Sequence, residues 1–418
     1  MNKERQIIHK IKNKLISNKA IITKADKGNT IVITYQQEYH NKIRDFIINN
    51  NLITINDPTK NFQKKIRNVL NECQIVTHKD EKWKYVNLNP SVPSIRGMIK
   101  IDKTGAPIRP VINWRNVPAY KLAKMLTKKL QMHIPLLFTF NVKNSVQLMD
   151  EILSIPFDPN LQFVSFDINN MYSNVPTSDI EQIIEFICNQ QFTDGLIKQE
   201  LVNMSKIIIE QNYFKFDNRY YSQENGLAMG SPTSSIFSEI YLQYTENPAV
   251  YDTLLHNKIM GYFRYVDDIL IIYDRTTTDI DKVLESFSKL MPTMKFTMER
   301  EINNRINFLD ITIIKEHNKL TFDIYRKPTA TNSIIPYDSC HPTEHKLAAI
   351  RYLTNRMNTY HLNTANKEKE RNIIKHILQK NKYDIGNEYT PKKPRKQNTN
   401  WTKMGKIHIC WKGNQVVH

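Results

Sequence analysis

Three acidic residues lie in segments whose pattern suits the binding of metal ions. Asp167 ends the apolar segment 163–167, and the pair Asp267 and Asp268 joins two apolar segments within residues 262–273. Adjacent carboxylates at the edge of an apolar hairpin need a cation or another partner to offset their charge. Because the ligand atoms are oxygens, the expected ions are Mg²⁺ or Mn²⁺. An exposed Asp-Asp turn of an ordinary hairpin is the alternative interpretation.

The order of these acids along the chain indicates nucleotidyl transfer. Two ions held roughly 3.5–4 Å apart can activate an attacking hydroxyl, stabilise the pentavalent phosphate and neutralise the leaving pyrophosphate. Between the acidic segments lies Gly-Leu-Ala-Met-Gly-Ser-Pro at 226–232, whose glycines allow close backbone approach and whose Pro232 favours a helix starting near Thr233. We therefore expect two ions, with Asp167 and Asp267 as the main ligands and Asp268 as an accessory ligand.

The periodicity of the remaining sequence predicts the elements that position these residues. Alternating apolar residues predict strands, and apolar residues three to four positions apart predict helices. A turn at 104–107 separates two strand-like segments, so we expect a hairpin with Lys100 on one arm and Arg109 on the other. Further strands are expected within 21–34, 163–167, 262–273, 307–315 and 319–325, and helices within 1–19, 36–80 and 345–382.

The composition of the chain indicates which class of molecule it binds. The 418 residues carry a formal net charge of +18, which favours a polyanionic partner such as nucleic acid. Residues 346–418 hold 16 Lys and Arg against 4 Asp and Glu, so this last sixth of the chain contributes 16 − 4 = +12. The four cysteines are far apart and predict neither a zinc knuckle nor a disulfide framework. No apolar run is long enough to span a membrane.

Several short motifs make the chain resemble reverse transcriptases, and within that class the Penelope-like retroelements. They are Lys-Ala-Asp-Lys-Gly-Asn at 24–29, Ser-Phe-Asp at 165–167 with Asn-Val-Pro at 174–176, Asn-Phe-Leu-Asp at 307–310, and Tyr-Arg-Lys-Pro at 325–328 followed by Ser-Cys-His-Pro at 339–342. The resemblance runs from about residue 21 to 356. The polymerase motifs identify the class, whereas the flanking stretches are informative as an ordered set.

The resemblance implies a right-hand polymerase, an α+β fold with an antiparallel palm sheet. It divides the chain into an N-terminal extension and outer fingers at 1–85, fingers at 86–160, a palm at 161–300, a primer-grip hairpin at 301–330, a helical thumb at 331–383 and a basic linker at 384–418. We expect the linker to be truncated.

The resemblance also implies residues that contact the nucleotide. Arg109 would grip phosphate oxygens through two bonds, and Lys100 would act as a point charge. Either could instead be a surface residue that meets the template backbone. Tyr172 follows Asp167 by five residues, at the position of the steric gate that excludes a ribose 2′ hydroxyl. A core aromatic is the alternative for Tyr172.

Two further positions are implied less directly. Gly230 and Ser231 match the loop that touches the template, but Met229 replaces the Gln of many reverse transcriptases, which puts a side-chain hydrogen bond to the template in doubt. Lys295 lies where related polymerases place a basic residue that protonates the leaving pyrophosphate. An exposed strand lysine is the alternative.

The expected function is that of an RNA-dependent DNA polymerase of a retroelement, acting on an RNA template, a DNA primer and dNTPs. An RNA-dependent RNA polymerase, a telomerase-like enzyme and a non-catalytic nucleic-acid-binding remnant are the alternatives. Tyr172 argues against the first, no segment suits the RNA-binding domain of the second, and the intact acids argue against the third.

The C-terminal sequence lacks a nuclease motif and contains a basic run. Penelope-like elements commonly continue into a GIY-YIG endonuclease, but neither Gly-Ile-Tyr nor Tyr-Ile-Gly occurs in this sequence. We expect a truncated copy or a lineage without the nuclease, so the primer would come from another activity or an existing DNA 3′ end. Free thiols and the basic run at 391–396 favour an intracellular, nuclear protein.

Overall fold

The computed structural model describes residues 3–28, 30–134, 136, 140–192, 194–316 and 318–384. The chain divides into two compact units that interleave along the sequence. Unit 1 comprises residues 1–139, 170–248 and 291–294, and unit 2 comprises residues 140–169, 249–290 and 295–418. The three candidate metal ligands therefore all belong to unit 2, while Arg109, Tyr172 and the loop at 226–232 belong to unit 1.

Unit 2 is built on a four-stranded antiparallel sheet with the strand order β11-β6-β10-β9. Its strands are β6 (Leu161–Asn169), β9 (Gly261–Tyr265), β10 (Asp268–Asp274) and β11 (Lys295–Arg300). Strand β10 is apolar from Ile269 to Tyr273, as expected for a strand that is buried on both faces, whereas β6 also carries polar residues among its buried apolar ones. This confirms the strands expected at 163–167 and within 262–273.

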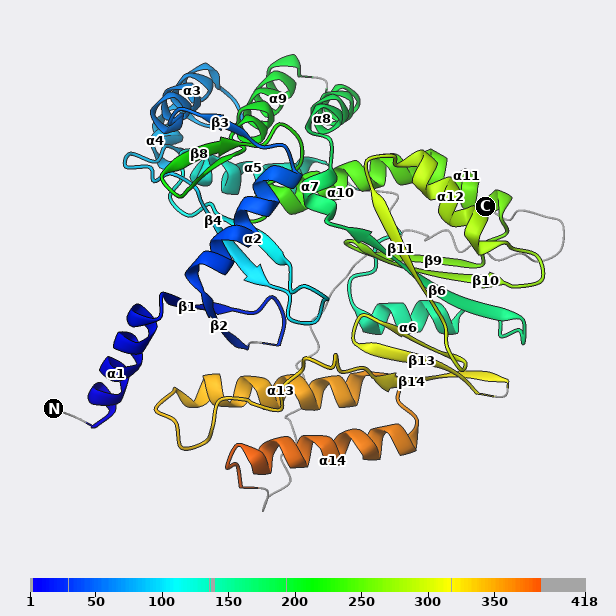
Figure 1. Cartoon of the computed structure of the whole chain (residues 1–418). Coiled ribbons are helices and arrows are strands. Elements are labelled where there is room, and N and C mark those ends of the chain that lie inside the picture. The colour runs from blue at the N-terminus through cyan, green and yellow to red at the C-terminus, as the bar shows by residue number, and fades with distance from the viewer. Residues whose placement is uncertain are drawn as a thin grey trace. The chain divides into compact units, whose positions relative to one another are not determined.

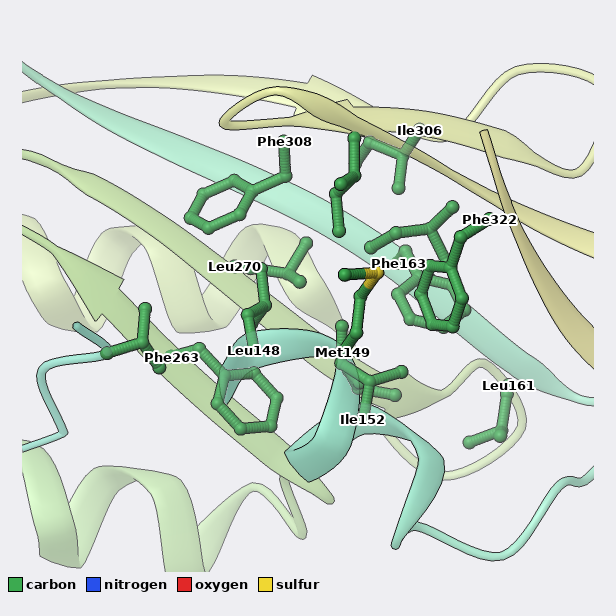
Figure 2. Close-up of a cluster of buried hydrophobic side chains, with 14 residues drawn as sticks. Leu148, Met149, Ile152, Leu161, Phe163, Phe263, Leu270, Ile306, Phe308 and Phe322 are labelled. Atoms are coloured by element: carbon green, nitrogen blue, oxygen red, sulfur yellow. The ribbon is translucent and has the colours of Figure 1, made fainter. Parts of the chain in front are cut away.

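One face of this sheet packs against α6 (Ser145–Leu153) and a small antiparallel sheet. The small sheet consists of β12 (Arg305–Phe308), β13 (Ile311–Glu316) and β14 (Lys319–Ile324). Figure 2 shows the cluster that joins the three parts, with Phe163 and Leu270 from the large sheet, Leu148 from α6, and Phe308 and Phe322 from the small sheet. On the opposite face, Phe287 of α12 (Ile280–Leu290) packs edge-on against Phe166, with ring centroids 5.9 Å apart.

The small sheet differs from the expected hairpin in having three strands. The segment expected as one strand at 307–315 breaks at Leu309, whose φ of +54° turns the chain between β12 and β13. The alternation of apolar and polar residues changes phase at this break, because Phe308 and Leu309 are adjacent apolar residues, and the interpretation as one strand did not use that signal. Strands β13 and β14 form the hairpin that was expected, with Glu316 opposite Lys319.

Two long helices complete the described part of unit 2. Helix α13 (Thr343–Thr359) and helix α14 (Thr364–Lys380) run side by side in opposite directions (Figure 1). The side chain of Asn363 caps α14 by accepting a hydrogen bond from the Asn366 backbone N–H at 2.7 Å. Leu353, Ile374 and Ile377 lie in the apolar core between them. The shorter α11 (Tyr251–His256) precedes β9.

Unit 1 contains a hairpin, a five-stranded sheet and most of the helices. The hairpin pairs β1 (Ala20–Lys24) with β2 (Ile31–Tyr35), as expected. The sheet has the strand order β3-β8-β7-β4-β5, from β3 (Ile53–Ile55), β4 (Ser94–Ile99), β5 (Ile108–Asn113), β7 (Tyr213–Phe216) and β8 (Arg219–Ser222). The helices are α1 (Lys3–Ser17), α2 (Gln36–Asn49), α3 (Thr59–Glu72), α4 (Lys82–Tyr85), α5 (Tyr120–His133), α7 (Met171–Asn174), α8 (Thr177–Gln191), α9 (Gly195–Glu210) and α10 (Ser234–Thr245), with a 3₁₀ turn at Lys79–Glu81 and a π turn at Glu246–Val250.

One strand of unit 1 interrupts a region that was expected to be helical. Strand β3 lies between α2 and α3 and pairs with β8, which lies more than 160 residues further along the chain. A three-residue strand is too short for its periodicity to be recognised, so only the partner strand defines it. Among the described residues, the helices that we observe are too short or too polar to cross a membrane.

Candidate active site

The three acids come together at one end of the central sheet of unit 2. Asp268 begins β10 and lies directly opposite Asp167 of β6 in the antiparallel register. Directly opposed residues project to the same face with their Cβ atoms about 4.5–5.5 Å apart. Asp267 precedes Asp268 in the turn, and its backbone carbonyl accepts a hydrogen bond from the Ile168 N–H at 3.1 Å. Asp167 is exposed, while Asp267 and Asp268 are half-buried.

The turn that carries Asp267 has an unusual backbone conformation. Tyr265 pairs with Asp268, so Val266 and Asp267 are the two central residues of a hairpin turn. Val266 has a φ of +58°, which is costly for a β-branched residue. Positive φ at the first central position alone is the pattern of a type II′ turn, where glycine is usual. The strain is located at the residue next to the acids.

A buried arginine donates a hydrogen bond to this turn and stabilises it. Arg264 of β9 is completely buried, and its Nη1 donates a hydrogen bond to the Val266 carbonyl oxygen at 3.3 Å. Its backbone is also fixed, because its N–H donates to Phe140 at 3.0 Å and its C=O accepts from Val142 at 2.8 Å. Sequence reasoning missed Arg264, although a charged residue inside an apolar strand beside two acids was a usable signal.

The loop at 226–232 is tied to two neighbouring segments of unit 1. The Leu227 N–H donates to the Tyr172 carbonyl oxygen at 2.6 Å, and the Ile112 N–H of β5 donates to the Met229 carbonyl oxygen at 2.8 Å. A Cβ at Gly230, whose φ is +124°, would lie 2.1 Å from the Ile112 carbonyl oxygen. The glycine therefore allows close approach to β5 of the same chain. Whether it also serves the template stays a prediction.

Two more predicted residues lie beside this loop. Tyr172 is half-buried on α7, the short helix after β6. The Ser231 hydroxyl lies 3.0 Å from the Thr233 hydroxyl, and the Ser231 N–H donates to Ala228 at 3.1 Å. Thr233 then precedes α10, which confirms the helix expected near that position. A backbone hydrogen bond within unit 1 thus connects Tyr172 to the loop that carries Gly230 and Ser231.

Arg109 and Lys100 lie on the β4–β5 hairpin, as expected, but Arg109 has a partner that the sequence did not reveal. Its Nε lies 3.0 Å from Oδ1 of Asp26, a carboxylate that is only 3% exposed. The Arg109 side chain is itself 45% exposed. Because the pair engages the inner nitrogen, the two terminal nitrogens of the guanidinium remain suited to phosphate oxygens. Lys100 follows β4, and its N–H donates to Pro107 across the hairpin at 2.8 Å.

Lys295 lies on the same sheet as the acids. It begins β11 and lies opposite Asn169 of β6, two residues beyond Asp167. Its side chain is exposed, so it is accessible to a ligand bound near the acids. The sheet register therefore brings Lys295 and the acids to the same end of the sheet, which sequence spacing alone could not establish.

The donor set fits divalent cations with oxygen ligands. Within the described ranges no cluster of three or more His, Cys, Asp or Glu side chains is closed enough to hold an ion. A closed cage is not required, because Mg²⁺ keeps several waters and is usually bound by one or two carboxylates together with substrate phosphates. Asp167 opposite Asp268, with Asp267 adjacent, supplies such an open arrangement of carboxylates.

Comparison with known families identifies the region that contains this site. Residues 101–301 match the model of the reverse transcriptase (RNA-dependent DNA polymerase) family. Residues 333–387 match an animal helix-turn-helix domain, a range that includes α13 and α14. A comparison with curated protein sequences finds no match.

Solved structures with a similar fold include two telomerases. The telomerase of Candida albicans in complex with a fragment of telomeric RNA superimposes with a TM-score of 0.57 at 11% identity, covering 90% of this chain and 64% of that one. The apo telomerase of Candida tropicalis gives a TM-score of 0.54 at 12% identity, covering 88% and 67%. This chain thus spans less than two thirds of the Candida albicans protein.

At this level of identity the likeness shows the fold alone, which is the α+β right-hand polymerase fold with an antiparallel palm sheet. The family match covers β6, β10 and the loop between them, and therefore all three acids. The chain carries a reverse transcriptase domain, the nucleotidyltransferase domain of RNA-directed DNA polymerases.

Proposed function

We propose that this chain extends a DNA primer with dNTPs on an RNA template, by two-metal nucleotidyl transfer. The observation that carries the proposal is the register of the palm sheet, which places Asp268 opposite Asp167 with Asp267 in the adjoining turn. Two Mg²⁺ ions bound by these acids would activate the primer 3′ hydroxyl and offset the charge of the triphosphate. Asp167 and Asp267 are the main ligands and Asp268 is the accessory one.

The remaining site residues have separate roles in this proposal. Arg109 binds phosphate oxygens of the incoming nucleotide through its terminal nitrogens, while Asp26 holds its inner nitrogen. Lys100 supplies a second positive charge from the same hairpin. Lys295 donates a proton to the leaving pyrophosphate, a role that suits an exposed lysine on the strand next to Asp167.

Tyr172 selects the sugar in this proposal. Its ring would occupy the volume that a ribose 2′ hydroxyl needs, so that deoxynucleotides are favoured. Support comes from the position of Tyr172 in the chain and from its backbone hydrogen bond to the loop at 226–232, which limits its movement. Gly230 and Ser231 would face the template from the same loop.

We further propose that the chain comes from a Penelope-like retroelement and acts in the nucleus. Support comes from contacts of three of the flanking motifs. Asp26 of the motif at 24–29 binds Arg109. Asp310 of the motif at 307–310 and Arg326 of the motif at 325–328 contact the α13–α14 pair. The basic run at 391–396, which underlies the nuclear assignment, lies outside the described residues.

The test is primer extension on poly(rA) with an oligo(dT) primer and Mg²⁺, comparing dTTP with UTP for the wild type and for Tyr172→Ala. The wild type should incorporate dTTP and exclude UTP, and Tyr172→Ala should accept both. Efficient use of UTP by the wild type would instead identify an RNA-dependent RNA polymerase. Extension that requires a dedicated RNA supplied with the protein would favour the telomerase-like alternative.

A further inference from the structure

A network of charged and polar side chains connects the α13–α14 pair to the acid-bearing part of unit 2. Its centre is Asp310, in the turn between β12 and β13. The Tyr360 hydroxyl, just after α13, donates to Oδ2 of Asp310 at 2.6 Å. The Ser145 hydroxyl, at the start of α6, donates to Oδ1 of the same carboxylate. Asp310 is thus held by α6, which packs against the four-stranded sheet of unit 2, and by the chain between α13 and α14.

The network continues through two arginines and a buried glutamate. Nη1 of Arg356 lies 3.5 Å from Asp310, and its Nη2 lies 3.9 Å from Glu370 of α14. Nη2 of Arg326, which follows β14, donates to the same Glu370 oxygen at 2.5 Å. The Glu370 side chain is only 2% exposed and that of Arg356 only 9%. Asp310 and Arg326 are 30% and 23% exposed, so the buried charges are those of Glu370 and Arg356, which balance.

The network links the α13–α14 pair to Asp310 through one short hydrogen bond and through ion pairs at longer range. Buried ion pairs are weak evidence for stability, because desolvation offsets much of their attraction, but the loss of one partner is costly. The bond from Tyr360 to Asp310 is short, whereas Arg356 is held at longer range from both carboxylates. Burial and the hydrogen bond to Asp310 raise the pKa of the Tyr360 phenol, so its hydroxyl stays protonated and donates at neutral pH.

We propose that Asp310, Tyr360, Arg356, Glu370 and Arg326 form a joint that holds the α13–α14 pair in place on the acid-bearing unit, and that this joint sets how many nucleotides are added per encounter with the primer–template. This inference rests on the proposed function. The five are positioning residues, since they act through the helices and not on the reacting atoms. Asp310 of the motif at 307–310 and Arg326 of the motif at 325–328 take no part in the proposed chemistry. Their place in the joint accounts for both residues.

The test compares Tyr360→Phe and Asp310→Asn with the wild type in two measurements. The first is the rate of addition of one nucleotide from a preformed complex, and the second is the dissociation rate of a fluorescent primer–template with its product length under a heparin trap. First-nucleotide addition by Tyr360→Phe should stay within about twofold, while dissociation from both variants should become about 2- to 10-fold faster, the effect of losing one hydrogen bond. Product length per encounter should shorten in proportion.

The control for Tyr360→Phe is Tyr244→Phe, which removes the same hydroxyl from a 45% exposed ring in unit 1. It should leave dissociation unchanged. In the double variant the effects of Tyr360→Phe and Asp310→Asn should add incompletely, because both weaken the bond between Tyr360 and Asp310, while Asp310→Asn also disturbs the contacts with Ser145 and Arg356. A purely structural role would lower the fraction of active enzyme without changing the dissociation rate of the active complexes.

Wild-type dissociation rates in both variants would overturn the joint, as would equal losses in first-nucleotide addition and in product length. Failure of the wild type to extend any primer would instead overturn the proposed function. The joint would then still be decided by the dissociation rates of the labelled primer–template, which require no catalysis.

Discussion

Val266 carries a conformational cost that the apolar pattern of its segment does not reveal. A β-branched residue with a φ of +58° is strained by roughly 1–3 kcal/mol, and the strain is maintained by the paired strands on either side and by the Arg264 hydrogen bond. Strained residues cluster at functional sites, where the surrounding structure fixes a geometry that the residue alone would not adopt. Here the geometry that is fixed is the position of Asp267.

Replacing Val266 with Gly should lower the activity without a large change in the free energy of unfolding. Glycine removes the strain but increases the entropy of the unfolded chain, so the free energy of unfolding should change by less than about 1 kcal/mol. The turn becomes less rigid, so kcat for dTTP addition should fall while the KM for dTTP changes little. Urea unfolding and steady-state extension measure the two quantities. A variant with unchanged kcat would show that the strain has no role in placing Asp267.

Arg109 depends on a carboxylate 83 positions away in the sequence, and this pair tests the triphosphate role. Asp26→Asn keeps the shape of the side chain but removes the charge that orients the guanidinium. We expect the KM for dTTP to rise about 2- to 10-fold with kcat within about twofold, the effect of weakening one charge-assisted contact. Asp102→Asn, which breaks the adjacent pair with Lys27 at 3.3 Å, is the matched control and should leave KM unchanged. An equal rise in both variants would argue for a general disturbance of the hairpin.

The loop at 226–232 is the element whose structural requirement is clearest. Gly230→Ala would bring a Cβ within 2.1 Å of the Ile112 carbonyl oxygen at a φ of +124°, so it should lower the free energy of unfolding by about 2–5 kcal/mol. Gly105→Ala is the matched control, because φ is +73° there but no atom lies within 4 Å, and it should cost only about 1–2 kcal/mol. Urea unfolding measures both. Equal losses would show that the approach of Gly230 to β5 is not a constraint.

Elements with long, regular patterns were predicted from the sequence, and short or interrupted ones were not. Strand β10 is a continuous apolar run from Ile269 to Tyr273, and β6 holds a shorter apolar cluster around Phe163 and Phe166, so both were located. The paired helices α13 and α14 follow from their apolar spacing. Strand β3 depends on a distant partner and leaves no periodic signal, while the break at Leu309 leaves only a change of phase in the alternation. The acids of the candidate site were selected by their type and order, and the strand register brings them together, while their role stays a prediction. Asp26 was missed as the partner of Arg109, because an ion pair between distant residues has no local pattern.

At the scale of the whole molecule, the two units interleave along the chain. Residues 170–248 return to unit 1 between the segments that carry Asp167 and Asp267. A linear division of the sequence into fingers, palm and thumb therefore stays a prediction. The net charge of +18 predicts binding to primer–template that weakens steeply as salt rises, because released counterions drive the association.

The cysteines give a test of the folded chain that does not depend on activity. Burial is the main cause that raises the pKa of Cys73 to about 12 and that of Cys188 to about 11. At pH 8 both thiols are therefore protonated in the folded protein and should resist iodoacetamide, while the exposed Cys340 should react. In urea all of them should react. Peptide mapping by mass spectrometry reads the outcome, and rapid native modification of Cys73 or Cys188 would contradict the core of unit 1.

The most direct test of the central claim is the single-nucleotide addition rate of acid-to-amide variants of the palm sheet. Asp267→Asn and Asp167→Asn should each lower the rate by at least about 1000-fold in Mg²⁺, because metal-ion catalysis supplies several kcal/mol. Asp274→Asn, at the far end of β10 where the carboxylate accepts hydrogen bonds from Thr276, should leave it within about twofold. A rate for Asp267→Asn within tenfold of the wild type would contradict a catalytic metal site at this turn.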